Sequence, residues 1–354
     1  MTRTPNATIT KRQSNMELLR ILAMFLVLLV HANYFSLGSP NIHQIQNESL
    51  DAILRIFFEA ISIVCVNVFI LISGWFGIKP TFKGLSNFIY QCLFFLTGLY
   101  MITIFIGVNE ISLHGIAGCI FATPLNWFIK AYLLLYLLSP VLNAFIRTTS
   151  QRTFKLVLIS YFAFTCTYGW IGSAAFMNDG YTTLFFIGLY LLARYSRIYT
   201  PNWVQYSSFT YFAIYFACVA FVTSVSFLVP YFGARDVPYN LYSYISPTTI
   251  IGALALLLCF AKIKIQNRFI NWCGKSCFAV FLMHVSPSTL WHFKSMFIYL
   301  HDNLQVLVFW AATFVILSII FIIYVLIDKV RIITYDFLYI HVFNKLEVMF
   351  NKYK

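Results

Sequence analysis

Charged residues are scarce in this sequence, and acidic residues are the scarcest of them. Of the 354 residues, 10% are charged and only 11 are Asp or Glu. A soluble domain of this size carries about a quarter charged residues. The deficit excludes an ordinary soluble protein, and the 60% share of hydrophobic residues favours a membrane protein.

Common motifs of nucleotide binding and hydrolysis are also missing. Gly274, Lys275 and Ser276 resemble the end of a phosphate-binding loop. However, Phe269 stands where the first glycine of that loop would be. No His-Glu-x-x-His, Gly-x-Ser-x-Gly or dinucleotide-binding pattern occurs, and no His is followed four residues later by Asp.

The cysteine pattern indicates neither disulfides nor a metal site. All 8 cysteines lie within or beside apolar runs, so no paired cysteines occur in loops expected outside a membrane. Cys273 and Cys277 are four residues apart, but no further ligand set accompanies them.

Long uninterrupted apolar runs dominate the chain, and they predict membrane-spanning helices rather than the short alternating strands of a barrel. We therefore expect an all-α, polytopic integral membrane protein with about ten transmembrane helices, and a short interfacial or re-entrant helix within 109–124. The expected spans are 16–37, 52–78, 85–108, 125–146, 156–171, 181–193, 207–230, 244–261, 269–287 and 304–327.

The net charge of +13 follows from lysines and arginines at one set of span ends. Only Arg55, Lys130, Arg235 and Lys294 fall on the other side or in its half of a span. This asymmetry predicts that both termini lie in the cytoplasm, and it explains the positive charge without a nucleic-acid partner. The expected parts are a cytoplasmic tail, one membrane domain and a basic cytoplasmic tail, at 1–14, 15–330 and 331–354.

The first span carries ionisable side chains on one face. Arg20 and His31 are eleven positions apart, close to three helical turns, and Glu17 lies one turn before Arg20. Such groups are costly within a membrane, so each is a candidate functional residue. A helix-end Glu–Arg pair and a hydrogen-bonded core histidine remain the alternative interpretation.

At these residues the sequence resembles the membrane-bound acyltransferase-3 family. The segments that carry the resemblance are Arg20 with His31, Ser73-Gly74, Trp127-Phe128 with Tyr132, Tyr136 and Pro140, and Ser276 with Phe281-Leu282 and His284. The chain departs from the family pattern at Phe281, where Tyr is usual, at Lys79 and Lys83, where Arg is usual, and at Lys130-Ala131, where one branch has Glu.

The resemblance implies an integral membrane O-acyltransferase of polysaccharide biosynthesis. Acetyl-CoA or another acyl-CoA would be the donor and co-substrate, without a metal. The acceptor would be a sugar hydroxyl of a lipid-linked or exported surface glycan or glycolipid. The expected location is the inner (plasma) membrane of a bacterium, within the lipid bilayer.

The candidate catalytic face contains His31 and Glu17. Histidine titrates near neutral pH, so His31 is the candidate general base that takes the proton from the acceptor hydroxyl. Arg20 lies about 16 Å nearer the cytoplasm and is the candidate ligand of the CoA phosphates. Lys79 and Lys83 are further candidate donor-binding residues, although positive-inside flanking explains them equally well.

Further candidates lie on other spans. Glu59 and Lys130 are expected at a depth similar to that of His31, and we hypothesise that they pair near it. Ser73 and Trp127 are candidate donor-site residues, with helix packing and an interfacial aromatic belt as their alternatives. The role of His284 stays open between packing and site support. Four histidines are expected to be solvated in outward loops: His43, His114, His292 and His301.

Two other functional classes compete with the enzyme. A transporter or flippase for a glycan or lipid intermediate would also have buried charges along a substrate path. Transporters often show two similar halves and paired broken helices, and neither is clear here. A scaffold of a glycan-synthesis complex would leave Arg20 and His31 without a role.

Overall fold

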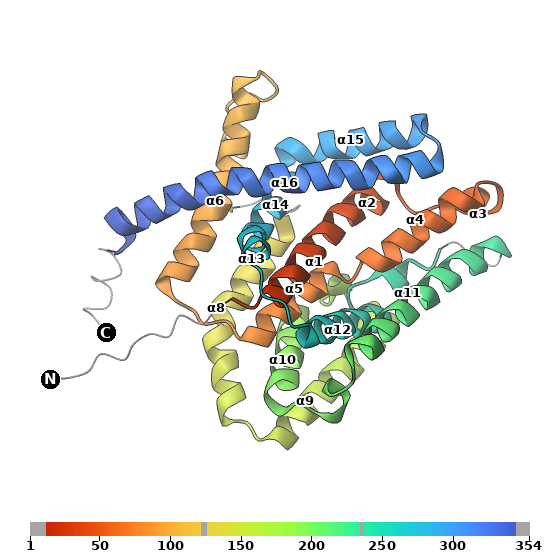
Figure 1. Cartoon of the computed structure of the whole chain (residues 1–354), viewed down its shortest axis with the longest axis horizontal. Coiled ribbons are helices and arrows are strands. Elements are labelled where there is room, and N and C mark those ends of the chain that lie inside the picture. Colours follow the sequence, from red (N-terminus) through yellow and green to blue (C-terminus); the bar gives the residue numbers. More distant parts are fainter. Residues whose placement is uncertain (1–11, 122–125, 234–236, 345–354) are drawn as a thin grey trace.

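The computed structural model is almost entirely helical (Figure 1). It describes residues 12–121, 126–233 and 237–344, and within these ranges it contains helices and no strand. The prediction of an all-α protein is therefore confirmed. The α-helices are α1 (Ser14–Ala32), α2 (Tyr34–Leu37), α3 (Ile42–Asn47), α4 (Ser49–Ser62), α5 (Cys65–Phe76), α6 (Phe82–Phe105), α7 (Leu113–Phe121), α8 (Trp127–Thr148), α9 (Gln151–Phe164), α10 (Thr183–Tyr199), α11 (Ser208–Tyr231), α12 (Pro247–Lys262), α13 (Arg268–Gly274), α14 (Cys277–His284), α15 (Pro287–Asn303) and α16 (Val306–Leu338).

Eight helical stretches in the described ranges are long and apolar enough to cross a membrane. The protein is therefore a multi-pass membrane protein. Two expected spans are not among the eight: α10 is 17 residues long, and the expected span 269–287 is divided among α13, α14 and the start of α15. The number of ten spans and the orientation of the termini stay predictions.

Helix α1 lies at the centre of the bundle, where it contacts α4, α5 and every helix from α12 to α16 (Figure 1). Its apolar side chains are buried on opposite sides of the helix, as Leu19 and Leu28 show. Because α13 to α15 return to α1 from the far end of the sequence, they place late residues beside the first span.

Helix α16 extends beyond the expected end of the membrane domain. The helix continues to Leu338, so the expected tail boundary at 330/331 falls inside it. Asp328 and Arg331 form a buried ion pair, and Arg331 also donates to Asn87 on α6. This pairing ties the end of α16 to α6. The expected tail segments 1–11 and 345–354 lie outside the described residues.

The expectation that residues 288–303 form an outward loop with a solvated His301 was wrong. These residues form α15, and His301 Nε2 lies 3.2 Å from Asp51 Oδ2 on α4. Asp51 also pairs with Arg55, which is 1% exposed and donates to the carbonyls of Leu37 and Gly38. The cluster joins the end of α2, the start of α4 and the end of α15.

His301 makes this cluster sensitive to pH. The hydrogen bond to Asp51 raises the pKa of His301 above its ordinary value of about 6.5. The pair therefore stabilises the fold fully below about pH 6.5, and this stabilisation is lost as pH rises through the raised pKa. We expect the midpoint temperature of unfolding to decrease as the pH rises from about 6 to about 9. The pair contributes at most about 1 kcal/mol to the free energy of unfolding.

The measurement is thermal unfolding of the purified protein across this pH range. A His301→Gln variant should lose part of the pH dependence, whereas His292→Gln, an exposed position on the same helix, should retain it. Equal profiles for wild type and His301→Gln would contradict the prediction.

Candidate functional site

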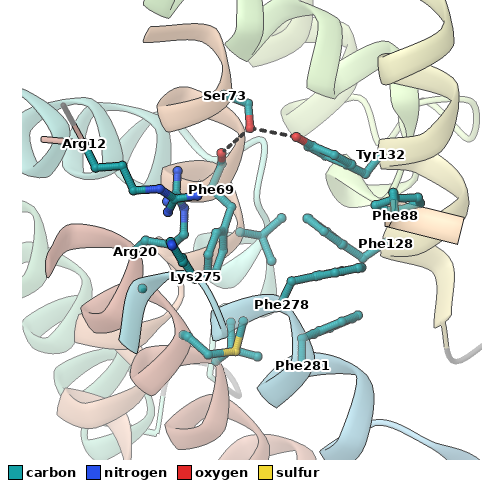
Figure 2. A pocket seen from close by; sticks show the side chains of 14 residues that line it. Arg12, Arg20, Phe69, Ser73, Phe88, Phe128, Tyr132, Lys275, Phe278 and Phe281 are labelled. Atoms are coloured by element: carbon teal, nitrogen blue, oxygen red, sulfur yellow. Dashed lines mark hydrogen bonds between the residues drawn. The ribbon is translucent and has the colours of Figure 1, made fainter. Parts of the chain in front are cut away.

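A cavity of about 320 Å³ lies between α1, α5, α6, α8 and the α13–α14 segment. This volume falls within the range of small-molecule sites in proteins. Figure 2 shows that Arg12, Arg20 and Lys275 gather on one side and aromatic rings on the other. The cavity is therefore cationic at one end and apolar at the other.

Glu17 organises the cationic end. Its buried carboxylate accepts from Arg12 Nη1 at 3.0 Å and from Arg20 Nη1 at 2.5 Å. Glu17 itself is not part of the cavity wall, and no acidic side chain among the described residues lines the cavity. Lys275 adds a third positive charge from the end of α13. This end of the cavity suits an anionic ligand.

Glu17 lies too far from His31 to act at the same atom. The two residues are 14 positions apart on α1, which corresponds to about 21 Å along the helix axis. Glu17 and His31 were expected to form one catalytic group, but they lie in two separate parts of the site. Glu17 belongs to the arginine end, where its contacts position Arg20.

Gly274 lets α13 approach Glu17 closely. A Cβ atom built on Gly274 would lie 2.4 Å from Glu17 Oε2 and 2.9 Å from its Cβ. The Gly274 backbone itself forms part of the cavity wall. The absence of a side chain here is what allows the carboxylate, Arg20 and Lys275 to share one corner.

The other walls of the cavity are aromatic. Phe88 and Phe278 stack at 5.2 Å between ring centroids, and Phe128 lies 5.3 Å from Phe281. The hydroxyls of Ser73 and Tyr132, which lie 3.2 Å apart, are the polar groups on this side (Figure 2). The result is an apolar passage with one pair of hydroxyls.

Ser73 and its neighbour Gly74 have separate roles. Ser73 lines the cavity. A Cβ on Gly74 would instead lie 2.5 Å from the Tyr190 carbonyl oxygen of α10. Gly74 is thus a helix-packing residue, whereas the hydroxyl beside it faces the ligand space.

His31 and His284 form a hydrogen-bonded pair just beyond the apolar end. His31 Nδ1 lies 2.7 Å from His284 Nε2. Val27, which lines the cavity, is one turn before His31, and the Phe281 ring is 5.9 Å from that of His284. His284 is completely buried. The pair therefore stands where the passage ends.

The hydrogen bonds determine where the protons lie when both rings are neutral. His284 Nδ1 is 2.8 Å from the Val280 carbonyl oxygen, which can only accept. His284 Nδ1 therefore carries the proton, and its Nε2 has a lone pair. His31 Nδ1 must then donate to that lone pair, which leaves His31 Nε2 as the unprotonated nitrogen.

The hypothesised pair of Glu59 and Lys130 is not formed in the described part of the chain. Glu59 is 2% exposed and accepts from Asn33 Nδ2 at 3.0 Å, whereas Lys130 is exposed. A neutral amide satisfies the carboxylate instead of a lysine. The sequence suggested this pair because both residues were expected at a similar depth. Depth along a helix does not determine the direction in which a side chain points.

Three other expected donor-site residues lie outside the cavity wall. Lys79 and Lys83 are exposed, and Lys83 lies over the Tyr339 ring at 4.4 Å. Trp127 packs against Tyr181, with 4.5 Å between ring centroids. The flanking and aromatic-packing interpretations describe these positions better than contact with a ligand in this cavity.

Sequence reasoning missed two of the cationic residues. Arg12 was placed in a tail and Lys275 in a broken phosphate-loop pattern, so neither was a candidate. The signal for Arg12 was its position five residues before Glu17. No local signal marked Lys275, since α13 meets α1 only through the tertiary fold.

Comparison with known proteins identifies the family. A family model described as an acyltransferase domain, that of acyltransferase-3, matches residues 13–327. The chain belongs to the acyltransferase-3 family. No curated protein and no solved structure matches it.

The acyltransferase-3 match covers the cavity-lining helices and both histidines. It ends within α16. With the apolar helices, it makes this protein a membrane acyltransferase.

Proposed function

We propose that this membrane acyltransferase transfers an acetyl or other short acyl group from acyl-CoA to a sugar hydroxyl of a lipid-linked or exported surface glycan. The observation that carries the proposal is the cavity, cationic at one end, whose apolar end meets the His31–His284 pair. One face of α1 contributes Arg20, Val27 and His31 to this path.

The cavity matches the chemistry of an acyl-CoA donor. The CoA phosphates would contact Arg12, Arg20 and Lys275, with Arg20 able to make a bidentate contact. The thin pantetheine arm would follow the aromatic passage, where the hydroxyls of Ser73 and Tyr132 can bond to its amides. The thioester would then reach the level of Val27 and Phe281, one helical turn from His31.

His31 Nε2 would act as the general base. It takes the proton of the acceptor hydroxyl while the hydroxyl oxygen attacks the thioester carbonyl carbon. The carbon–sulfur bond then breaks, and the departing CoA sulfur takes the proton from His31. The products are an O-acyl ester and free CoA, with His31 returned to its starting state.

His284 would act through His31 rather than on the substrate. As His31 becomes positively charged, its Nδ1 donates a charge-assisted hydrogen bond to His284 Nε2. Such a bond contributes about 1.5–3 kcal/mol. The bond from His284 Nδ1 to Val280 keeps the accepting nitrogen free of a proton, so the relay holds His31 in the tautomer that the base requires.

The proposed function is tested with acetyl-CoA labelled in its acetyl group. Membranes containing the protein should transfer label to the glycan fraction, in a form that mild base releases, as expected for an ester. Membranes without the protein are the control. Failure to exceed that control would overturn the proposal, and an effect on glycan export without labelling would favour a transporter.

A pair of His284 variants tests the relay. His284→Phe keeps a ring but removes the acceptor, and we expect the transfer rate to fall about 10- to 100-fold. His284→Gln can place its amide oxygen near the position of Nε2, so it should retain more activity than the Phe variant. Equal rates in the two variants would show that His284 serves packing alone. The measurement is the rate of label transfer at saturating acetyl-CoA.

A further inference from the structure

A small exposed surface lies next to His31, beginning at Phe35, four residues further along the chain. The Phe35 ring of α2 lies 5.3 Å from the His31 ring, and 38% of Phe35 is exposed. Helix α15 packs on α2 and adds Lys294 and Trp291. Lys294 Nζ lies 5.7 Å from the ring centroids of both Phe35 and Trp291. We call these three residues the α2–α15 surface.

This surface lies apart from the donor cavity. None of its three residues lines that cavity. Arg20 and Val27 mark the donor side of His31, while Phe35 follows His31 by one turn. A ligand on the α2–α15 surface would therefore reach His31 without occupying the path of acyl-CoA.

Lys294 carries a positive charge that has no carboxylate within 4.0 Å among the described residues. The acids Asp302 on α15 and Asp51 on α4 have other partners. His301 contacts both of them, and Asp51 also pairs with Arg55. Contact with exposed aromatic rings contributes only about 0.5–1 kcal/mol. Lys294 is half-buried as a residue, and its ammonium group has three hydrogen-bond donors to offer an anion.

The two aromatic side chains offer apolar faces beside this charge. Trp291 is 60% exposed and Phe35 is 38% exposed. Flat aromatic faces bind the apolar C–H face of a sugar ring through dispersion and hydrophobic contact. An aromatic pair around a lysine therefore matches a ligand that has both a sugar ring and a negative charge.

We propose that the α2–α15 surface binds the acceptor, and that the acceptor is an anionic saccharide. Its ring would lie on Trp291 and Phe35, its phosphate or carboxylate would bind Lys294, and its hydroxyl would face His31 Nε2. This inference rests on the proposed acyl transfer, because it assigns the second substrate of the same site.

Binding of small saccharides to the detergent-solubilised full-length protein tests the assignment by saturation-transfer NMR. The probes are glucose 1-phosphate, glucuronate, methyl glucoside and inorganic phosphate. We expect the two anionic sugars to bind about tenfold more tightly than methyl glucoside. Lys294→Met should abolish this preference, Lys294→Arg should keep it, and Trp291→Leu should weaken the binding of every sugar.

Tyr299→Leu provides the matched control, since Tyr299 is an aromatic residue of α15 with 66% exposure. It should leave binding unchanged. The assignment is overturned if Lys294→Met binds all probes as the wild type does, or if inorganic phosphate competes as well as glucose 1-phosphate. Unchanged sugar binding in Trp291→Leu would also overturn it and would indicate that the ring faces lipid.

The binding experiment is independent of catalysis. If the wild type binds the anionic sugars but membranes show no acyl transfer, the proposed function fails while the surface stands. If transfer occurs and Lys294→Met requires the same acceptor concentration as the wild type, the assignment of the acceptor to this surface is wrong. The proposed function then still holds. In the expected case Lys294→Met raises the acceptor requirement and leaves the KM for acetyl-CoA unchanged.

Discussion

Replacing His31 with alanine is expected to reduce acyl transfer by about 10²- to 10⁴-fold, the range that a general base contributes. The alanine variant removes His31 Nε2, the unprotonated nitrogen of the histidine pair that accepts no hydrogen bond from the described residues. The binding of acetyl-CoA should change little, since Arg20 and the aromatic walls lie on the other side of Val27. The measurement is label transfer together with the KM for acetyl-CoA.

The control for this variant is His43→Ala. His43 is exposed and lies on the short helix α3, away from the cavity, so it should be fully active. Thermal unfolding of His31→Ala must show a folded protein, because its partner His284 is completely buried. Retention of wild-type transfer by a folded His31→Ala protein would refute the mechanism.

Replacing Arg20 with methionine is expected to raise the KM for acetyl-CoA about 10- to 100-fold, because charge-assisted hydrogen bonds contribute about 1.5–3 kcal/mol. Methionine keeps the length of the aliphatic stem but removes the guanidinium group. The fold should survive, since Glu17 keeps its contact with Arg12 at 3.0 Å. The rate at saturating acetyl-CoA should change much less than the KM.

Two further variants sharpen the Arg20 result. Arg20→Lys keeps a positive charge but not the bidentate geometry, so its KM should fall between those of the wild type and Arg20→Met. Arg12→Met should have a smaller effect, because 46% of the Arg12 side chain is exposed to solvent. A normal KM combined with a low rate in Arg20→Met would place Arg20 in a role other than donor binding.

The local features of the fold could be predicted from the sequence. Long apolar runs indicated the helices, and the spacing of Arg20 and His31 placed them on one face of α1, because both signals depend only on helical geometry. A short helix was likewise expected within 109–124, and α7 occupies Leu113–Phe121. Such predictions need no knowledge of neighbouring helices.

The contacts between distant segments could not be predicted in the same way. His31 and His284 are 253 positions apart, and no periodicity reports which helices become neighbours. The hypothesised Glu59–Lys130 pair shows the same limit: the expected similarity in depth suggested a pair, but Asn33 donates to Glu59 instead. The broken helix region from α13 to α15 was also hidden, because its apolar residues resemble one continuous span.

The missing side chain at Gly274 determines which substitutions the cationic corner can tolerate. Any larger residue would occupy the space of the Glu17 carboxylate, and α13 or the carboxylate would have to move. Because Glu17 holds Arg12 and Arg20 together, the displacement would spread to both arginines. Position 274 should therefore behave in mutational scans as a site-proximal position that accepts almost no replacement, although it carries no functional group of its own.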